Sequence, residues 1–199
     1  MRRALPTEGD QQLDAVASGT SDNPFAVLGR HETTMKGRPA VVIRTMQPAA
    51  SRVELVTPDG ATPMERRRSE GLYEATIPLD GRAAHEVVYR LRLHDGADVR
   101  EVVDPYQYRQ VLTDFDLHLL NEGTHYRAWE KLGSHDVVVD GIAGIHFAVW
   151  APNAQRVSVI GDFNRWDGRA HQMRKLVPAG IWEIFIPDLA DGACYKYEV

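Results

Sequence analysis

The sequence predicts an all-β fold: two tandem immunoglobulin-like antiparallel β-sandwiches, with short helices preceding each. One observation is the period-two alternation of apolar side chains in short runs broken by turn residues. The run "IHFAVW", for example, places Ile145, Phe147 and Val149 on one side of a strand. The other observation is an internal repeat, which requires that both halves of the chain adopt the same fold.

The repeat is visible as three pairs of matching segments. "GTSDNPFAVLGRH", from Gly19, matches "GTHYRAWEKLGSH", from Gly123, at an offset of 104 residues. "VVIRTMQPAASRVELV" matches "IHFAVWAPNAQRVSVI" at the same offset, and "GLYEATIP" matches "GIWEIFIP" at 109. The offset changes only where loops are expected, and loops tolerate insertions. We therefore expect two copies of one domain.

Four segments follow from the repeat. We expect a flexible N-terminal segment over 1–19, a first β-sandwich module over 20–105, a packed connector over 106–123 and a second β-sandwich module over 124–199. The second module is expected to be truncated at its C-terminus, because the chain ends inside a predicted strand. The connector is too rich in Tyr, Phe and Leu to be a free linker, so we expect it to pack between the modules and fix their relative pose.

A short helix is expected before each sandwich. In "DNPFAVLG", Asn23 or Asp22 is a suitable N-cap, Pro24 suits the first helical position and Gly29 suits the C-terminus. In "THYRAWEKLG", Thr124 is the expected cap and Gly133 the expected stop. A further marginal helix is possible in "LDAVASG".

Composition argues against several function classes. The net charge is -5 and the sequence has no basic stripe, so we expect no nucleic-acid partner. No run of about 18 apolar residues is present, so we expect no membrane span. The single cysteine, Cys194, permits no disulfide within the chain, which favours a reducing compartment and a cytoplasmic protein. Its alternating apolar setting predicts a buried side chain.

No catalytic or metal-binding motif is apparent. Asp114 and Asp116 lie two apart in the connector, with no paired acid nearby in sequence. The histidines lack the spacing of a zinc site, so we expect no metal and no cofactor. His31 and His135 occupy equivalent positions of the repeat, which favours a structural role in hydrogen-bonding a turn over a role as ligands.

The turn "GDFNRW" differs from an ordinary turn, because it carries the aromatic residues Phe163 and Trp166. We expect Phe163 in the core. The equivalent residues 57–62 of the first copy read "TPDGAT", with neither an aromatic nor an amide side chain. The sandwich itself therefore does not require Trp166. Two interpretations stay open: a binding platform, or packing against another domain. Trp150 and Trp182 lie in alternating strands, which favours core or interdomain packing.

Longer strings carry a resemblance to a known family. "DNPFAVLGRH", "LTDFDLHLLNEGTHYRAWEKLGSH", "GIHFAVWAPNAQRVSVIGDFNRWDGR" and "YKYEV" resemble the N-terminal part of bacterial 1,4-alpha-glucan (glycogen) branching enzymes over about residues 20 to 199. Within this part, "FAVWAP", "GDFN" and "YKY" resemble the glycogen- and starch-binding module that these enzymes share with isoamylases. The resemblance implies a parent enzyme that cuts an alpha-1,4-glucan and transfers the segment to a 6-hydroxyl, forming an alpha-1,6 branch in glycogen biosynthesis.

The resemblance also implies a partner and a site. The parent's catalytic carboxylates lie on a following (β/α)8 barrel, so no catalytic residue is expected in this chain, which alone should be inactive. The expected partners are alpha-glucan (glycogen and maltooligosaccharides) and that barrel. The carbohydrate-binding residues implied are Trp166 and Lys196, with Asn164 and Trp182 as further contacts. The alternatives are modules that only brace the barrel, or a stand-alone glycogen sensor.

Overall fold

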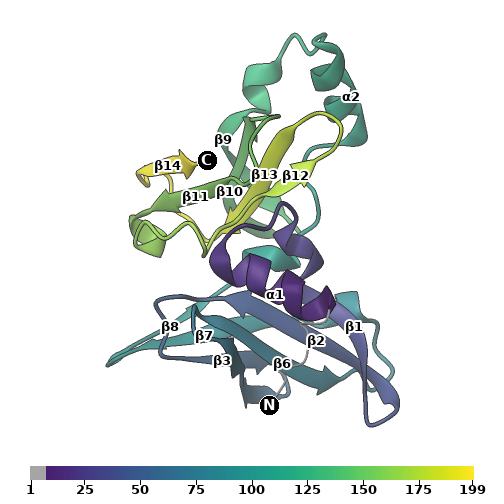
Figure 1. The fold of residues 1–199 in the computed structure, drawn as a ribbon, viewed down its shortest axis with the longest axis vertical. Coiled ribbons are helices and arrows are strands. Elements are labelled where there is room, and N and C mark those ends of the chain that lie inside the picture. The colour runs from purple at the N-terminus through teal and green to yellow at the C-terminus, as the bar shows by residue number, and fades with distance from the viewer. Residues whose placement is uncertain (1–7) are drawn as a thin grey trace, which may run out of the picture.

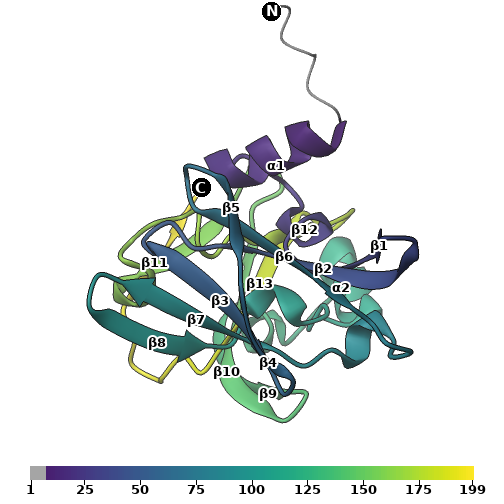
Figure 2. The same ribbon diagram turned by 90° about the horizontal axis from the view of Figure 1, so that it is seen from below.

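The computed structural model describes residues 8–199, which form two β-sheet modules joined end to end (Figure 1). Figure 2 shows the first module from below, with the sheet that contains β3, β7 and β8 in front. Two α-helices and five 3-10 turns connect the strands of the described residues. The first module contains β1 (Gly29–Met35), β2 (Arg38–Met46), β3 (Arg52–Thr57), β4 (Gly60–Pro63), β5 (Glu65–Arg68), β6 (Leu72–Pro78), β7 (Arg90–Asp95) and β8 (Asp98–Val102).

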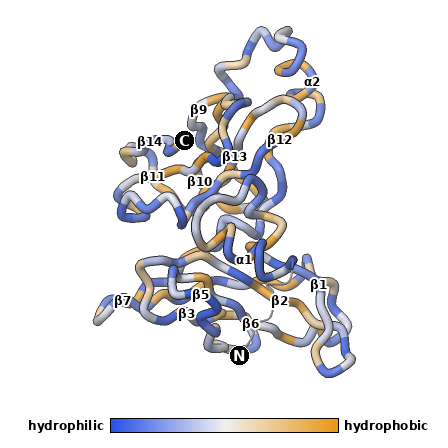
Figure 3. The backbone as a smooth tube through the Cα atoms, in the orientation of Figure 1, coloured by the Kyte–Doolittle hydropathy of each residue, from blue (hydrophilic) through white to orange (hydrophobic). Residues whose placement is uncertain are grey.

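The first module is a sandwich of two antiparallel sheets, ordered β1-β2-β6-β5 and β4-β3-β7-β8. Period-two alternation sends one side of each strand into the space between the sheets. Figure 3 shows apolar residues along the strands and polar residues in most of the loops between them. The strand faces expected from the sequence meet in one core, which includes Val41, Ile43, Val53, Leu55, Tyr73, Tyr89 and Leu91.

The second module repeats this arrangement. Its strands are β9 (Gly133–Val139), β10 (Ile142–Trp150), β11 (Ser158–Gly161), β12 (Arg174–Leu176), β13 (Ile181–Pro187) and β14 (Tyr195–Glu198). The sheet order β9-β10-β13-β12 reproduces β1-β2-β6-β5, and β11 pairs with β14 as β3 pairs with β7. The all-β fold and the repeat expected from the sequence are therefore both present in the structure.

Equivalent glycines meet equivalent prolines in the two copies. Gly71 has φ of +106° and Gly180 has φ of +67°, a region that favours glycine. A Cβ on Gly71 would lie 2.6 Å from Cα of Pro48, and a Cβ on Gly180 would lie 2.6 Å from Cβ of Pro152. Pro48 and Pro152 occupy equivalent positions of the repeat, as do Gly71 and Gly180, so the same close approach of the backbone occurs in both modules.

The connector covers the outer face of the second module's larger sheet. Its 3-10 turn η3 (Pro105–Gln107) is followed by an extended segment and by α2 (Asp114–Glu122). Tyr108 packs edge to face on Phe185, with ring centroids 4.9 Å apart, and Leu112 joins Ala148 in a small apolar cluster. As a result β10 and β13 are buried on both faces, although their sequences alternate.

Helix α1 (Glu8–Ser18) replaces most of the flexible segment that we expected over 1–19; residues 1–7 lie outside the described part of the chain. Leu13 and Val16 are buried in a cluster that also contains residues of both modules. Arg68 bonds Asp14 at 2.6 Å, and Gln172 Nε2 donates to the Val16 carbonyl at 3.0 Å. Contacts with both modules therefore order the helix, and these contacts were not visible in its weak apolar pattern. The boundaries of the four segments stay a prediction.

The helices expected before each sheet are shorter than the sequence suggested. Only the 3-10 turns η1 (Pro24–Ala26) and η4 (Ala128–Glu130) form, and Asn23 stands before η1 without a side-chain cap. Turns η2 (Ala84–Glu86) and η5 (Asp162–Asn164) complete the set. The expectation for Cys194 was wrong: its side chain is exposed, because it lies in the loop before β14 and not in the strand.

Candidate carbohydrate-binding site

The turn after β11 is built around a glycine with no space for a side chain. A Cβ on Gly161 would lie 2.5 Å from the ring of Phe163 and 2.5 Å from the carbonyl oxygen of Cys194. Phe163 is half-buried against the core and meets His171 edge to face, with centroids 5.5 Å apart. Phe163 thus packs against the core, as expected, but stays partly exposed and is not one of its buried residues. Its ring anchors the turn to the module.

Asn164 holds the turn in shape with its side chain. Its Oδ1 accepts from the Gly161 backbone N–H at 2.9 Å, and its Nδ2 donates to the Val159 carbonyl at 2.8 Å and to Nδ1 of His171 at 2.8 Å. The residue is buried. The expected direct contact of Asn164 with sugar is therefore corrected: both amide donors and Oδ1 bond groups inside the protein, where they fix the backbone that presents Trp166.

Trp166 and Lys196 come together on the surface. Trp166 is 41% exposed, and its indole N–H donates to Asp162 Oδ1 at 2.8 Å. Nζ of Lys196, on β14, lies 5.8 Å from the centroid of the Trp166 ring. An exposed indole can stack on the apolar C–H face of a pyranose, and the neighbouring ammonium can donate to its hydroxyls. This pair is the part of the expected site that the structure assembles.

The backbone of this turn also favours a fixed platform. Arg165 and Trp166 both have left-handed φ values, +56° and +61°, which non-glycine residues adopt rarely. The Trp166 N–H donates to the Gly161 carbonyl at 2.9 Å and closes the turn. The bond to Asp162 then restricts the indole. Such restraint lowers the entropy that a binding side chain loses when a ligand orders it.

Trp182 lies in the core, so the expected contribution of this residue to the site is corrected. Its side chain is fully buried on β13 and its indole N–H donates to the Ala151 carbonyl at 3.0 Å. The ring also lies 5.4 Å from Nζ of Lys175. The alternation of "IWEIFIP" directs this ring between the sheets, where no glucan reaches it. Its core position agrees with the packing interpretation of the strand.

A group of exposed aromatics lies on the second module, and the sequence analysis considered only Trp150 among them. Trp150 is 64% exposed, which excludes the core position and leaves interdomain packing as a prediction. It lines a small cavity with Leu120, His125 and Leu132, and Trp129 and Tyr126 in the neighbouring segment are also exposed. Trp150 ends its strand beyond the covered part of the sheet, which the alternating pattern could not reveal.

No metal site appears among residues 8–199, since no group of three His, Cys, Asp or Glu side chains is arranged to hold an ion. In the same described residues, no helix is long and apolar enough to cross a membrane. Asp116 is occupied structurally: it forms a capping box with Thr113 at the start of α2 and lies 3.2 Å from His125 Nε2. Its pKa is lowered to about 2, because hydrogen bonds from Thr113 and His125 outweigh the opposing effect of burial.

Two families match separate parts of the chain. Residues 9–106 match the alpha-1,4-glucan branching enzyme GlgB, N-terminal domain. Residues 131–199 match carbohydrate-binding module 48 (isoamylase N-terminal domain). The second match contains Trp166 and Lys196, whereas the first contains the module whose equivalent turn has no aromatic.

Curated relatives agree with both matches. The chain is 53% identical to the 1,4-alpha-glucan branching enzyme GlgB of Paramagnetospirillum magneticum, over 100% of this chain and 26% of that protein. It is 47% identical to the enzyme of the same name from Gloeobacter violaceus, over 98% of this chain and 26% of that protein. Apo pullulanase from Paenibacillus barengoltzii aligns at a TM-score of 0.32 and 22% identity, over 65% of this chain and 19% of that one, which is too weak a likeness to support an argument. The chain thus spans about a quarter of the length of these curated relatives, and it belongs to the 1,4-alpha-glucan branching enzyme family, as the N-terminal region with its carbohydrate-binding module.

Proposed function

We propose that this region binds alpha-glucan through the Trp166–Lys196 platform and positions it for the parent branching enzyme. The observation that carries the proposal is the exposed indole of Trp166, held by Asp162 and flanked by the Lys196 ammonium. An exposed Trp in a restrained turn is poorly explained by folding alone, because the first module folds with "TPDGAT" at the same place. The carbohydrate-binding family match includes these residues.

The platform suits a polymer better than a small molecule. Trp166 stands on the surface and does not line the cavity of about 430 Å³ between the modules, so a glucan strand can lie across it without threading into a pocket. One stacked ring and one ammonium give a weak contact, and repeated sugar units raise the local concentration of binding partners. We therefore propose that glycogen and longer maltooligosaccharides bind more tightly than maltose.

Affinity electrophoresis in native gels that contain glycogen tests the proposal. The wild-type chain should migrate more slowly with glycogen than without it. Trp166→Ala should lose most of this retardation, and we expect its affinity to fall about tenfold or more, as for a Trp that dominates a binding surface. Trp129→Ala is a matched control, because Trp129 is also exposed but lies near η4, in another part of the module.

Three outcomes would contradict the platform. They are no retardation of wild type, equal retardation of Trp166→Ala and wild type, and a loss of retardation in Trp129→Ala as large as that in Trp166→Ala. Circular dichroism of each variant shows whether the fold is retained, so that loss of binding is not confused with unfolding. Maltose, maltotetraose and glycogen as competitors in the same gel then rank the preference for chain length.

For the parent protein we propose the reaction that its relatives' name describes: branching of 1,4-alpha-glucan. In this proposal the described residues contribute glucan binding. Asp114 and Asp116, the acidic pair of the connector, have a structural place in the first turn of α2. A cytoplasmic location stays a prediction from the sequence. The isolated chain should show no branching of amylose by iodine staining, whereas activity of the isolated chain would contradict this assignment of roles.

A second candidate function is a bracing role, favoured by the exposed Trp150, Trp129 and Tyr126. Large apolar side chains that gather on a surface often mark a protein interface. The curated relatives are about four times as long as this chain, so a further part of the parent is available as a partner. The two functions use different residues. In the parent protein, Trp150→Ser should lower the melting temperature without changing glycogen retardation. Trp166→Ala should reduce glycogen retardation without changing the melting temperature.

A further inference from the structure

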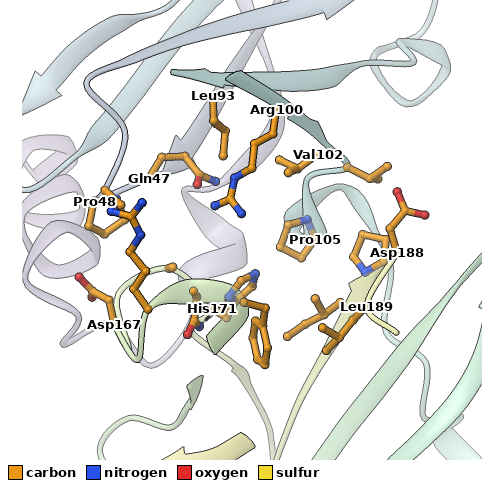
Figure 4. Close-up of a pocket in the computed structure, with 18 of the residues that line it drawn as sticks. Gln47, Pro48, Leu93, Arg100, Val102, Pro105, Asp167, His171, Asp188 and Leu189 are labelled. Carbon is orange, nitrogen blue, oxygen red and sulfur yellow. Dashed lines mark hydrogen bonds between the residues drawn. The ribbon is translucent and has the colours of Figure 1, made fainter. Parts of the chain in front are cut away.

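A cavity with a volume of about 430 Å³ lies between the two modules (Figure 4). One wall comes from the first module, including Gln47, Leu93 and Arg100. The opposite wall comes from the second module and includes Phe163 and His171. This volume lies within the range of small-molecule sites in proteins, about 300 to 1,000 Å³.

Apart from Arg100, every charged side chain that lines this cavity belongs to one of four ion pairs. Two of them cross from one module to the other and brace its rim: Arg165 with Asp95, and Arg90 with Asp188 at 3.0 Å. Two lie within a module: Arg169 with Asp167 at 2.7 Å, and Arg92 with Glu101 at 2.7 Å. Every carboxylate that lines the cavity is therefore already neutralised by a guanidinium.

Arg100 differs from these arginines. Its guanidinium makes no hydrogen bond and no ion pair within residues 8–199, and Figure 4 shows it pointing from β8 into the cavity, toward His171. The side chain is exposed, so solvent reaches it through the open side of the cavity. After the other pairs are accounted for, the lining carries one uncompensated positive charge.

His171 offers a second donor. Its Nδ1 lies 2.8 Å from Nδ2 of Asn164, and an amide nitrogen can only donate, so Nδ1 accepts. The neutral imidazole then carries its proton on Nε2, for which the described residues provide no acceptor. Burial and the positive charge of Arg100 lower the pKa of His171 to about 4, so the ring is neutral at pH 7. Arg100 and His171 thus present unused donors from opposite walls.

We propose that this cavity binds a small organic anion, a phosphate or carboxylate group carried on a body of about one sugar ring, with the anionic group held by Arg100 and His171. A guanidinium is well suited to either group, because its planar fork can donate twice. The remaining lining is apolar where Leu93, Pro105 and Leu189 lie, which suits the body of the ligand. Gln47 donates through Nε2 to Thr45 and so keeps its Oε1 free for a ligand hydroxyl.

The position of the cavity gives such a ligand a structural effect. Arg100 belongs to the first module and His171 to the second, so one anion would link the modules across their junction. The turn that carries Trp166 also supplies Phe163 and Asn164 to the cavity wall. The anion site is distinct from the glucan platform, because Trp166 itself does not line the cavity.

Isothermal titration calorimetry and thermal denaturation of the 199-residue chain test the proposal, at constant ionic strength and pH 7. The probes are glucose 6-phosphate, glucuronate, inorganic phosphate and glucose. The comparison between the first two probes shows which anionic group is preferred on the same ring. The Trp166→Ala variant is titrated alongside wild type, so that any sugar bound at the platform is recognised.

We expect glucose 6-phosphate or glucuronate to bind and to raise the melting temperature, with inorganic phosphate weaker and glucose without effect. Arg100→Ala should weaken the organic anion about tenfold or more, since it removes the free charge. Arg38→Ala is the matched control: Arg38 is an exposed β2 residue without an ion pair inside the described chain, and it lies outside the cavity lining. Trp166→Ala should bind the anion like wild type.

Several results would overturn the proposal. They are the absence of binding by both organic anions, equal binding by glucose and glucose 6-phosphate, and equal losses in Arg100→Ala and Arg38→Ala. If inorganic phosphate bound as tightly as both organic anions, the sugar ring of the ligand would contribute nothing to binding. Loss of binding in Trp166→Ala would place the ligand on the platform. Because Arg100 is exposed and unpaired, Arg100→Ala should fold normally, and an unchanged melting temperature without ligand checks this.

Discussion

His31 and His135 make the same hydrogen bond in the two modules. Nε2 of His31 donates to the carbonyl of Leu28 at 3.0 Å, and Nε2 of His135 donates to the carbonyl of Leu132 at 3.0 Å. Each bond spans three residues and closes the turn that leads into the first strand of its module. The structural role expected from the repeat is therefore confirmed, and neither histidine is part of a metal site in the described chain.

This symmetry predicts equal effects of substitution. His31→Ala and His135→Ala should each lower the free energy of unfolding by about 1 kcal/mol, the net value of a typical hydrogen bond. Urea denaturation measures both. His118→Ala is the control, because His118 is exposed on α2 and makes only a 3.5 Å contact with Glu122. A loss confined to one of the two repeated histidines would show that their roles differ despite their geometry.

Asn164 and Trp166 should give opposite phenotypes, although they lie two residues apart. Asn164→Ala removes three hydrogen bonds of a buried amide, and the freed Gly161 N–H and Val159 carbonyl lose a partner. We expect a loss of about 2 to 4 kcal/mol in stability, because a buried unsatisfied group costs about 1 to 3 kcal/mol. Trp166→Ala should change stability little and glycogen binding strongly.

The comparison is made with urea denaturation and glycogen gels on the same two proteins. Asn164→Asp is the informative second variant, because it keeps the acceptor for the Gly161 N–H and loses the donor to Val159. It should be intermediate in stability if the amide acts through the turn. If Asn164→Ala were as stable as wild type, the amide would not hold the turn, and the structural role given to it here would be wrong.

The repeat explains how much of the fold and site could be predicted. Period-two alternation and the 104-residue offset were enough for the strands and their inward faces, because both depend on local sequence. The divergence of "TPDGAT" from "GDFNRW" was enough to select Trp166, since a residue that one copy lacks is not required by the fold. The exposed Trp166 beside Lys196 agrees with that selection, and its binding role stays a proposal.

Other features depend on contacts between distant segments. The side chain of Asn164 looks polar in the sequence, and only its partners Gly161, Val159 and His171 show that it is buried and used. Likewise, the alternation of β13 predicts one solvent-exposed face, but the connector covers that face and buries Glu183. Helix α1 has a weak apolar pattern and becomes ordered because Arg68 and Gln172 hold it from two modules.

We predict that the Glu183 carboxylate holds the connector on the second module. Its carboxylate is fully buried and accepts from the backbone N–H groups of Val111 and Leu112 and from Nε2 of His146 at 3.0 Å. It also forms an ion pair with Arg174 at 3.2 Å. Glu183→Ala leaves Arg174 buried without its partner, so we expect a loss of about 3 to 5 kcal/mol.

Limited proteolysis and urea denaturation check this prediction. The segment 106–123 should become sensitive to protease in Glu183→Ala at urea concentrations where wild type resists. Glu198→Ala is the control, because Glu198 pairs with Arg156 at the surface, where ion pairs contribute about 0 to 1 kcal/mol. Equal protease resistance of Glu183→Ala and wild type would mean that apolar contacts such as Tyr108–Phe185 hold the connector without the carboxylate.

Asp104 predicts a pH dependence of stability at the end of the first module. Burial raises the pKa of its carboxyl from 3.8 to about 6, although the Tyr89 hydroxyl donates to it at 2.7 Å and the Tyr106 N–H at 3.1 Å. The folded protein therefore holds this proton more tightly than the unfolded chain. The stabilisation is fully present well below pH 4 and is lost as the pH rises through 6. A shift of this size corresponds to about 3 kcal/mol.

Asp104→Asn removes this titration while it keeps the size of the side chain. We expect the free energy of unfolding of wild type, minus that of Asp104→Asn, to fall by about 2 kcal/mol between pH 4 and pH 7, since part of the full effect lies below pH 4. The lowered pKa of His171 acts in the opposite direction, since its contribution is present above about 6.5 and is lost as the pH falls through 4. That contribution is common to both proteins, so it cancels in the difference. A difference that stays constant with pH would show that the Asp104 carboxyl has an ordinary pKa in the folded protein.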